Sequence, residues 1–120
     1  GEGFGIPFIE AMACEVPVIA TDYTTSKELI FDDGQSGELV NLAGNQKYVE
    51  PIYQTITGNW NVERGIADVM HGAEMLNKLY YNRELCKIYG KTGKRKVDKY
   101  YNWDIVIPQW DKLFRNMMNE

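Results

Sequence analysis

Residues 1–20 read GEGFGIPFIEAMACEVPVIA, and this stretch decides the fold class. Its first five residues include three glycines, which allow positive φ angles and close approach of the backbone to a ligand, so a loop is predicted there. Pro7 suits the first turn of a helix, and the apolar residues after it predict a helix over Pro7–Cys14. A short buried strand is predicted over Pro17–Ala20.

The alternation of helix and strand continues downstream. Thr25–Glu28 fits a capping box, in which Thr25 caps a short helix through Ile30 and Glu28 reaches back to it. After a turn-forming segment, Glu38–Val40 is predicted as a second strand. This order predicts an α/β fold with a parallel, partly complete Rossmann-like sheet. Because the strand that should precede Gly1 is missing, we expect the chain to be a fragment of a longer protein.

Helices are predicted for the C-terminal half. Asp68, Asn82 and Asn102 each precede apolar residues at helical spacing and are predicted to cap a helix. Residues 41–61 give no clear pattern, and 62–67 are predicted to be extended. We assign residues 1–67 to the latter half of a Rossmann-like domain. Residues 68–120 are assigned to a C-terminal helical segment of the same domain.

Three details of these helices give further expectations. Gly90 and Gly93 count against the continuity of the helix that follows Asn82. Pro108 should kink the last helix or mark its first turn. The Trp103 and Trp110 stripe on that helix is predicted to pack in the core or against another domain.

Composition excludes several classes of protein. The chain has 120 residues, a net charge of −4 and no recognised nucleic-acid motif, so nucleic-acid binding is not expected. No apolar stretch is long enough to cross a bilayer, and no signal peptide is visible. Cys14 and Cys86 lack metal-type spacing and are expected to be thiols buried in the core. Together these features favour a cytoplasmic location.

Charge is unevenly distributed along the chain. Residues 1–40 hold eight acidic residues and one basic residue, a net charge of −7. Six of the thirteen basic residues lie in residues 87–99. The run Lys91–Lys99 is expected to form a solvated helix face, and the alternative is contact with phosphates or with an anionic membrane surface.

Two carboxylates are the candidate chemical groups. Glu2 precedes the first predicted helix and Glu10 lies in its first turns, so both can face one pocket at the carboxyl edge of the sheet. Carboxylates accept hydrogen bonds from vicinal hydroxyls such as those of a sugar or a ribose. The alternative is structural: Glu10 complements the helix dipole and Glu2 is a solvated loop charge. A glycosidase acid/base pair is disfavoured, because neither residue has a recognisable hydrolase setting.

The same residues resemble the signature of a known family. Its pattern is Glu-Gly-Phe-Gly-Leu/Ile-Pro, then a second glutamate eight residues after the first, then Ala-Met-Ala-Cys-Gly-x-Pro-Val-Ile-Ala. Glu2–Pro7, Glu10–Cys14 and Pro17–Ala20 match it. On these residues the chain is similar to the retaining glycosyltransferases of family four (glycosyl transferases group 1), which have the two-domain GT-B fold. The resemblance covers about residues 1–40 and 68–120.

The resemblance implies that residues 1–67 are the latter half of a nucleotide-sugar-binding domain, and it implies a role for each residue of the motif. Glu10 is expected to hydrogen-bond the ribose of a UDP- or GDP-sugar donor, which is a substrate; no cofactor and no metal is expected. Glu2 is expected to be the catalytic residue, binding the transferred sugar and stabilising its developing positive charge. Backbone N–H groups of the loop are expected to contact the sugar or the diphosphate. The remaining donor-binding residues are expected to be Gly3, Phe4, Gly5 and Ile6.

The chain departs from the family's pattern at two places. Glu15 stands where the family usually has glycine, and is expected to face solvent because its charge opposes the helix dipole. Tyr23–Ser26 stands where the family often has paired glycines, so a turn beside the pocket is expected to differ.

The charge distribution bears on what this chain can do alone. In the family, an Arg and a Lys for the diphosphate lie upstream, together with the acceptor-binding N-terminal domain. We therefore expect no transfer and weak or no donor binding by this chain alone. The alternative function is a non-catalytic module for assembly or regulation. The missing half of the sheet would leave apolar surface exposed, so self-association is expected.

Overall fold

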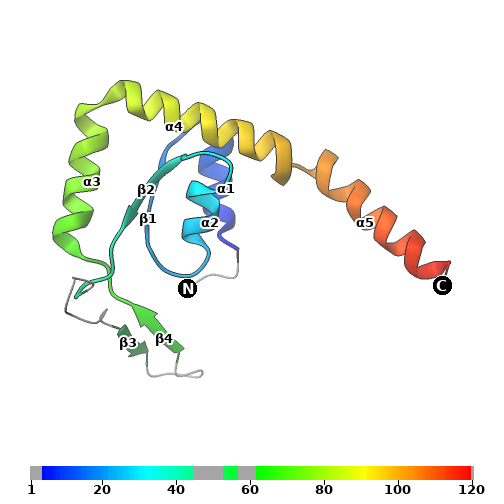
Figure 1. Cartoon of the computed structure of the whole chain (residues 1–120), viewed down its shortest axis with the longest axis horizontal. Coiled ribbons are helices and arrows are strands. Elements are labelled where there is room, and N and C mark those ends of the chain that lie inside the picture. The colour runs from blue at the N-terminus through cyan, green and yellow to red at the C-terminus, as the bar shows by residue number, and fades with distance from the viewer. Residues whose placement is uncertain (1–3, 45–52, 57–61, 120) are drawn as a thin grey trace.

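The computed structural model describes residues 4–44, 53–56 and 62–119 of the chain. The helices and strands follow one another in an α/β order (Figure 1). In chain order they are α1 (Ile6–Ala13), β1 (Val18–Thr21), α2 (Ser26–Phe31), β2 (Gly37–Val40), β3 (Tyr53–Ile56), β4 (Val62–Gly65), α3 (Val69–Tyr81), α4 (Arg83–Lys96), the π-helical turn η1 (Val97–Tyr101) and α5 (Trp103–Met118).

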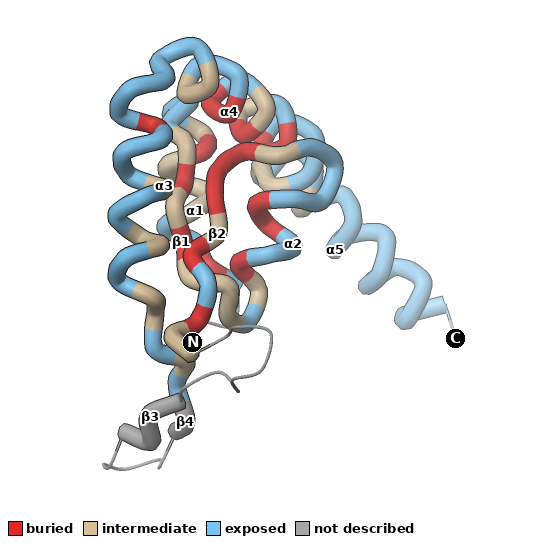
Figure 2. The backbone as a smooth tube through the Cα atoms, turned by 60° about the vertical axis from the view of Figure 1, so that its left-hand side comes forward, coloured by how far each residue is buried: buried red, intermediate tan, exposed pale blue. Residues whose placement is uncertain are grey.

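The sheet at the centre of the fold is parallel, as the sequence predicts. β1 pairs with β2 in a register that runs from Val18 opposite Gly37 to Thr21 opposite Val40. Figures 1 and 2 show α3 on one side of these strands and α2 on the other. A separate antiparallel pair joins β3 to β4, which confirms the extended prediction for residues 62–67 over most of its length.

The core lies where α1 and the end of α4 meet the sheet. Its buried members come from four segments of the chain, and Figure 2 shows the buried residues concentrated here. These members are Met12, Val18, Ala20, Ile30 and Val97. α5 lies apart from this core and has no buried residue, so the expectation that Trp103 and Trp110 pack in the core of this chain is wrong.

The three predicted caps at the starts of the C-terminal helices are confirmed. The side chain of Asp68 accepts a hydrogen bond from the His71 N–H at 3.1 Å. Asn82 and Asn102 do the same at the starts of α4 and α5, at 3.0 and 3.1 Å. Pro108 lies inside α5 and does not mark its first turn, which begins at Trp103.

The predicted capping box at Thr25 is wrong. Thr25 precedes α2, but its hydroxyl makes no capping bond and instead donates to the Phe4 carbonyl at 3.2 Å. The Thr25 backbone has φ −80° and ψ −5°, which is helical and unlike the extended geometry that a capping side chain needs. A contact across the fold therefore replaces the local bond that the sequence pattern favours.

Gly90 and Gly93 do not interrupt α4, although the sequence counts them against its continuity, and both glycines serve packing. A Cβ at Gly90 would lie 2.2 Å from the Glu15 carbonyl oxygen, and one at Gly93 would lie 3.1 Å from Met12 Cγ. Without side chains at these positions, α4 can run directly against α1. The helix is continuous over Arg83–Lys96 and passes into η1.

The basic run is only partly the solvated face that the sequence predicts. Lys96 is 1% exposed, and its ammonium donates to the carbonyls of Leu29, Ile30 and Gly34 at 2.8, 3.0 and 2.8 Å. Burial is the main reason that the pKa of Lys96 falls to about 8. Lys96 therefore joins α4 to α2 and to the turn after it.

Asp33 lies on the surface at the same end of the fold and bonds to side chains of α4 and η1. Its carboxylate accepts from Tyr100, Arg95 and Lys99 at 2.6, 3.1 and 3.2 Å. These bonds, with the Tyr100 hydroxyl first, hold the pKa of Asp33 well below its usual range. The basic residues of the run are thus largely committed to structural contacts.

The expectation that both cysteines are buried in the core is wrong. Cys14 is exposed, and Cys86 is half-buried. Cys14 follows α1 directly, and the chain then turns through Glu15, which has φ 58°. That left-handed angle favours glycine, which accounts for the glycine that the resembling family carries there. Glu15 is exposed, as predicted.

Candidate functional site

The loop before α1 is held from two directions. Gly5 has φ 91° and ψ 52°, and its carbonyl accepts from the Phe8 N–H at 3.0 Å at the start of the helix. The Phe4 carbonyl accepts from the Thr25 hydroxyl, and the Phe4 ring meets the Tyr101 ring edge-on with centroids 5.6 Å apart. The backbone at the helix N-terminus is therefore fixed by α2 on one side and by η1 on the other.

The N–H groups of Gly5 and Ile6 are available at this helix start. Neither has a hydrogen-bond partner in the part of the chain that the structure describes. Pro7 has no N–H group to offer. Such unpaired N–H groups at a helix N-terminus favour acceptor groups of a ligand.

Glu10 lies one turn further along α1, exposed, in a groove between α1 and α5. The groove has a volume of about 820 Å³ and is mainly apolar. Glu10 is the one charged residue among the described residues that line it. The lining consists of Phe4, Ile6, Ile9, Glu10, Tyr101, Trp103, Val106 and Trp110.

The structure brings some of the predicted site residues together and leaves others apart. Phe4, Ile6 and Glu10 line the same groove. Gly5 does not line it, and faces a second pocket on the other side of the α1 start. Glu2 and Gly3 lie outside the described residues, so the convergence of the two carboxylates stays a prediction.

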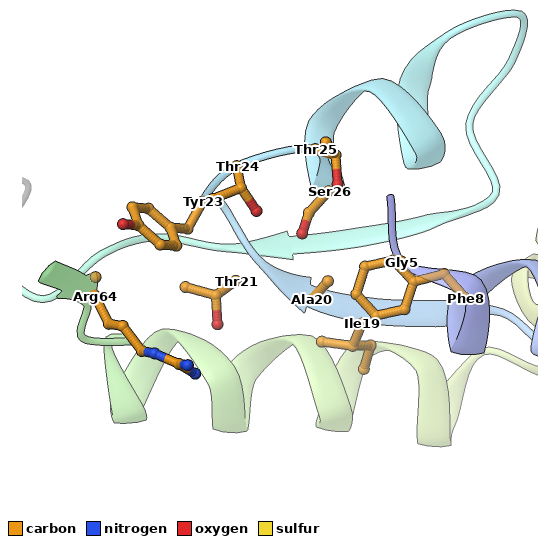
Figure 3. A pocket seen from close by; sticks show the side chains of 11 residues that line it. Gly5, Phe8, Ile19, Ala20, Thr21, Tyr23, Thr24, Thr25, Ser26 and Arg64 are labelled. Atoms are coloured by element: carbon orange, nitrogen blue, oxygen red, sulfur yellow. The ribbon is translucent and has the colours of Figure 1, made fainter. Parts of the chain in front are cut away.

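The second pocket lies at the carboxyl end of β1 and has a volume of about 410 Å³ (Figure 3). It is lined by Gly5, Phe8, Ile19, Ala20, Thr21, Tyr23, Thr24, Thr25, Ser26, Arg64 and Gly65. The sequence pointed to the turn Tyr23–Ser26 but missed Arg64, because residues 41–61 gave no pattern from which to place it. The available signal was the residue itself, one of two basic residues between positions 28 and 77.

Comparison with known proteins shows the family. Residues 1–64, more than half of the chain, match the family described as glycosyl transferases group 1. The chain belongs to this family. The resemblance drawn from the first twenty residues is therefore confirmed at the level of group 1 glycosyltransferases.

Two relatives of this group 1 glycosyltransferase domain align with nearly all of it. An uncharacterized glycosyltransferase of Methanocaldococcus jannaschii is 24% identical over 119 residues, 99% of this chain and 24% of the relative. The capsular polysaccharide biosynthesis glycosyltransferase CapM of Staphylococcus aureus is 26% identical over 119 residues, 99% of this chain and 25% of CapM. The chain thus spans about a quarter of the length of these relatives.

A solved structure supports the fold of the group 1 domain. Sucrose-phosphate synthase from Thermosynechococcus elongatus matches with a TM-score of 0.71 and 24% identity, over 98% of this chain and 23% of that one. The predicted α/β class is confirmed. No helix in the described ranges is long and apolar enough to cross a membrane.

Proposed function

We propose that this chain is the donor-binding part of a retaining glycosyltransferase of family four. The whole protein would transfer a sugar from a UDP- or GDP-sugar to an acceptor held by a preceding domain. Membership of the group 1 family and the alignment with two glycosyltransferases support transfer as the reaction class.

The exposed carboxylate of Glu10 in the α1–α5 groove is the observation that carries this proposal. A mainly apolar groove with one charged residue is typical of small-molecule sites. Glu10 extends from the same helix whose first N–H groups are unpaired, so one ligand can meet both features. We assign Glu10 to the ribose hydroxyls of the donor, because a carboxylate accepts two hydrogen bonds from a vicinal diol.

The start of α1 suits the other end of the donor. The N–H groups of Gly5 and Ile6 have no partner among the described residues, and the positive end of the helix dipole at this N-terminus favours negative charge. We propose that they bind the diphosphate or the sugar hydroxyls together with the backbone of Gly3 and Phe4. Glu2 would then lie beside the transferred sugar and stabilise its positive charge as the leaving group departs.

Substitution of Glu10 in the whole protein tests the assignment. Glu10→Gln keeps the size of the side chain but removes its charge, and a lost hydrogen bond to a charged group corresponds to about 10–100-fold weaker transfer at low donor concentration. Glu15→Gln is the matched control, because Glu15 is an exposed acid beyond the other end of the same helix. Unchanged transfer in Glu10→Gln would refute the role of Glu10.

The same experiment separates transfer from the alternative of a non-catalytic module. If the whole protein shows no transfer yet functions normally in the cell with Glu10→Ala, the module is the correct interpretation. If both transfer and cellular function are lost in the Glu10→Ala variant, the protein acts as a glycosyltransferase.

The chain alone is proposed to bind the donor weakly or not at all. Residues 1–40 carry a net charge of −7, which repels a diphosphate, and no basic residue lines the groove among the described residues. Calorimetry with UDP- and GDP-sugars checks this proposal, and submicromolar binding by the chain alone would contradict it.

A further inference from the structure

The chain on either side of the β3–β4 pair forms a short ladder of hydrogen bonds at the start of α3. The Ala43 N–H donates to the Ile66 carbonyl at 2.7 Å, and the Asp68 N–H donates to the Asn41 carbonyl at 2.8 Å. The residues between these two bonds form an antiparallel bridge. Figure 1 shows the chain that leaves β2 meeting the chain that leaves β4 at this place. We call residues 41–43 and 66–68 the base ladder.

His71 adds one more bond to the base ladder. Its Nδ1 atom accepts a hydrogen bond from the Asn41 N–H at 2.9 Å. The cap of α3 places this residue, because the His71 N–H donates to the Asp68 carboxylate at 3.1 Å. The Gly72 N–H donates to the Asp68 carbonyl at 2.9 Å and continues the helix. Both backbone groups of Asn41 are thus bonded to the start of α3, one to the main chain and one to an imidazole.

The bond from Asn41 requires a neutral imidazole. A ring nitrogen accepts a hydrogen bond only when it carries no proton, and in the imidazolium both ring nitrogens are donors. Protonation would therefore place one N–H group against another, so the charge on the ring and the bond from Asn41 exclude each other. His71 is the one histidine of the chain, and histidine is the side chain whose charge ordinarily changes between pH 5 and 8.

The base ladder positions one wall of the pocket at the carboxyl end of β1. Arg64 and Gly65 line this pocket and directly precede the ladder in the chain. Their packing is close, because a Cβ at Gly65 would lie 2.5 Å from Leu42 and 3.2 Å from the Tyr23 ring. Figure 3 shows Arg64 extending from β4 beside the start of α3. A change at the ladder therefore reaches the pocket wall through adjacent residues.

We propose that His71 is a pH-sensitive switch for the base ladder. At pH 8 the neutral ring accepts from the Asn41 N–H and closes the ladder. As pH falls toward 5 the ring gains a proton, the bond breaks, and the ladder opens more often. The pocket wall formed by Arg64 and Gly65 then loses part of its support. The proposal does not rest on the proposed function, since no donor and no transfer step enter it.

Other charged side chains on the segments that meet here could titrate in place of His71. The described ones are Asp22, Glu38, Arg64, Asp68, Glu74 and Lys78. Glu38 and Lys78 pair with each other, and no ion pair joins His71 to a carboxylate within the described ranges. Carboxylic acids ordinarily titrate at about pH 4, and lysine and arginine above about pH 10. The window from pH 8 to pH 5 therefore separates a histidine from these groups.

Nuclear magnetic resonance on the chain tests the bond itself. A scalar coupling passes through an N–H···N hydrogen bond, so it is expected at pH 8 between the amide nitrogen of Asn41 and Nδ1 of His71. The coupling should be lost at pH 5. The signals of the His71 ring should titrate over the same pH range as this loss.

Amide hydrogen exchange tests the effect on the ladder. The protection factors of the Ala43 and Asp68 amides should be roughly three- to tenfold lower at pH 5 than at pH 8, the change that loss of one hydrogen bond produces. The Ser36 amide is the internal control, because it donates to the Ile30 carbonyl before the first residue of β2, at the other end of that strand. Its protection factor should not change.

Two variants complete the test. His71→Asn places a carbonyl oxygen where Nδ1 lies, so it keeps an acceptor that does not titrate in this range. Its protection factors should be the same at pH 8 and pH 5. His71→Phe keeps a ring but removes the acceptor, and its ladder should show the lower protection at both pH values.

The inference is overturned if no coupling joins Asn41 to His71 at pH 8. It is also overturned if His71→Asn loses protection at pH 5 as the unmodified chain does, which would assign the effect to another group. An equal loss at Ser36 would show that acid opens the whole fold and would overturn it as well. Should His71→Phe fail to fold, the coupling and His71→Asn still decide the question.

Discussion

Substitution of Gly90 by alanine should destabilise the fold, although alanine is the better helix former. Gly90 lies in the middle of α4, where its Cα faces Glu15 in the turn that follows α1. A Cβ there would lie 2.2 Å from the Glu15 carbonyl oxygen and 2.9 Å from its carbon. Since ordinary C···O contacts are about 3.3 Å long, α1 and α4 would have to separate by roughly 1 Å.

The magnitude follows from two opposing terms. In an unconstrained helix the change from glycine to alanine stabilises by about 1 kcal/mol. Separating the helices disturbs the packing of Met12, which is fully buried and contacts α4 at Gly93. Overpacking of this kind costs about 1–3 kcal/mol, and lost dispersion contacts add to it. We therefore expect a net loss of about 1–2 kcal/mol in the free energy of unfolding.

Urea denaturation followed by far-ultraviolet circular dichroism measures this free energy. Gly72→Ala is the matched control in α3, because the nearest atom to its Cβ would be Val40 Cγ1 at an ordinary 3.7 Å. That variant should be as stable as the unmodified chain or gain up to about 1 kcal/mol. If Gly90→Ala proved as stable as Gly72→Ala, the close approach of α1 and α4 would be refuted.

Three further predictions concern other contacts of the fold. Lys96→Met should lower the free energy of unfolding by about 2–4 kcal/mol, because three carbonyls lose their shared donor, and the same urea assay checks this. Glu15→Gly should raise the free energy of unfolding by about 1 kcal/mol, because glycine adopts the left-handed φ without strain. A higher thermal midpoint would check this. The pKa of Asp33 is lower in the folded chain than in the unfolded chain. As pH falls below about 4, the unfolded chain therefore binds a proton at Asp33 before the folded chain does, and stability is lost. Asp33→Asn should flatten that part of the pH profile of the urea midpoint, and an unchanged profile would contradict the assignment.

The parts of the fold that the sequence predicts well depend on neighbouring residues. Asp68, Asn82 and Asn102 cap their helices through bonds that span three residues, so the pattern alone is enough. Parallel neighbouring strands require a crossover connection, and the helix predicted between β1 and β2 provides one. The α/β class could therefore be predicted from the sequence alone.

The contacts that the sequence did not predict join residues far apart. Lys96 reaches carbonyls 62 to 67 residues away, and a run of basic residues gives no sign that one of them is buried. Thr25 satisfied a local capping pattern but was drawn to Phe4, 21 residues earlier. The position of Arg64 could not be predicted for the same reason, because it depends on how β4 packs against Leu42.

Two left-handed residues with side chains, Glu15 and Thr24, differ in their surroundings. Both have φ close to 57°, and both stand where the resembling family favours glycine. Glu15 is exposed and lines neither the groove nor the pocket described above, so its strain is explained by the sharp turn that follows α1. Thr24 has the same left-handed angle and lines the pocket at the carboxyl end of β1. A left-handed angle alone therefore does not mark a functional residue, because the turn that follows a helix can require it as well.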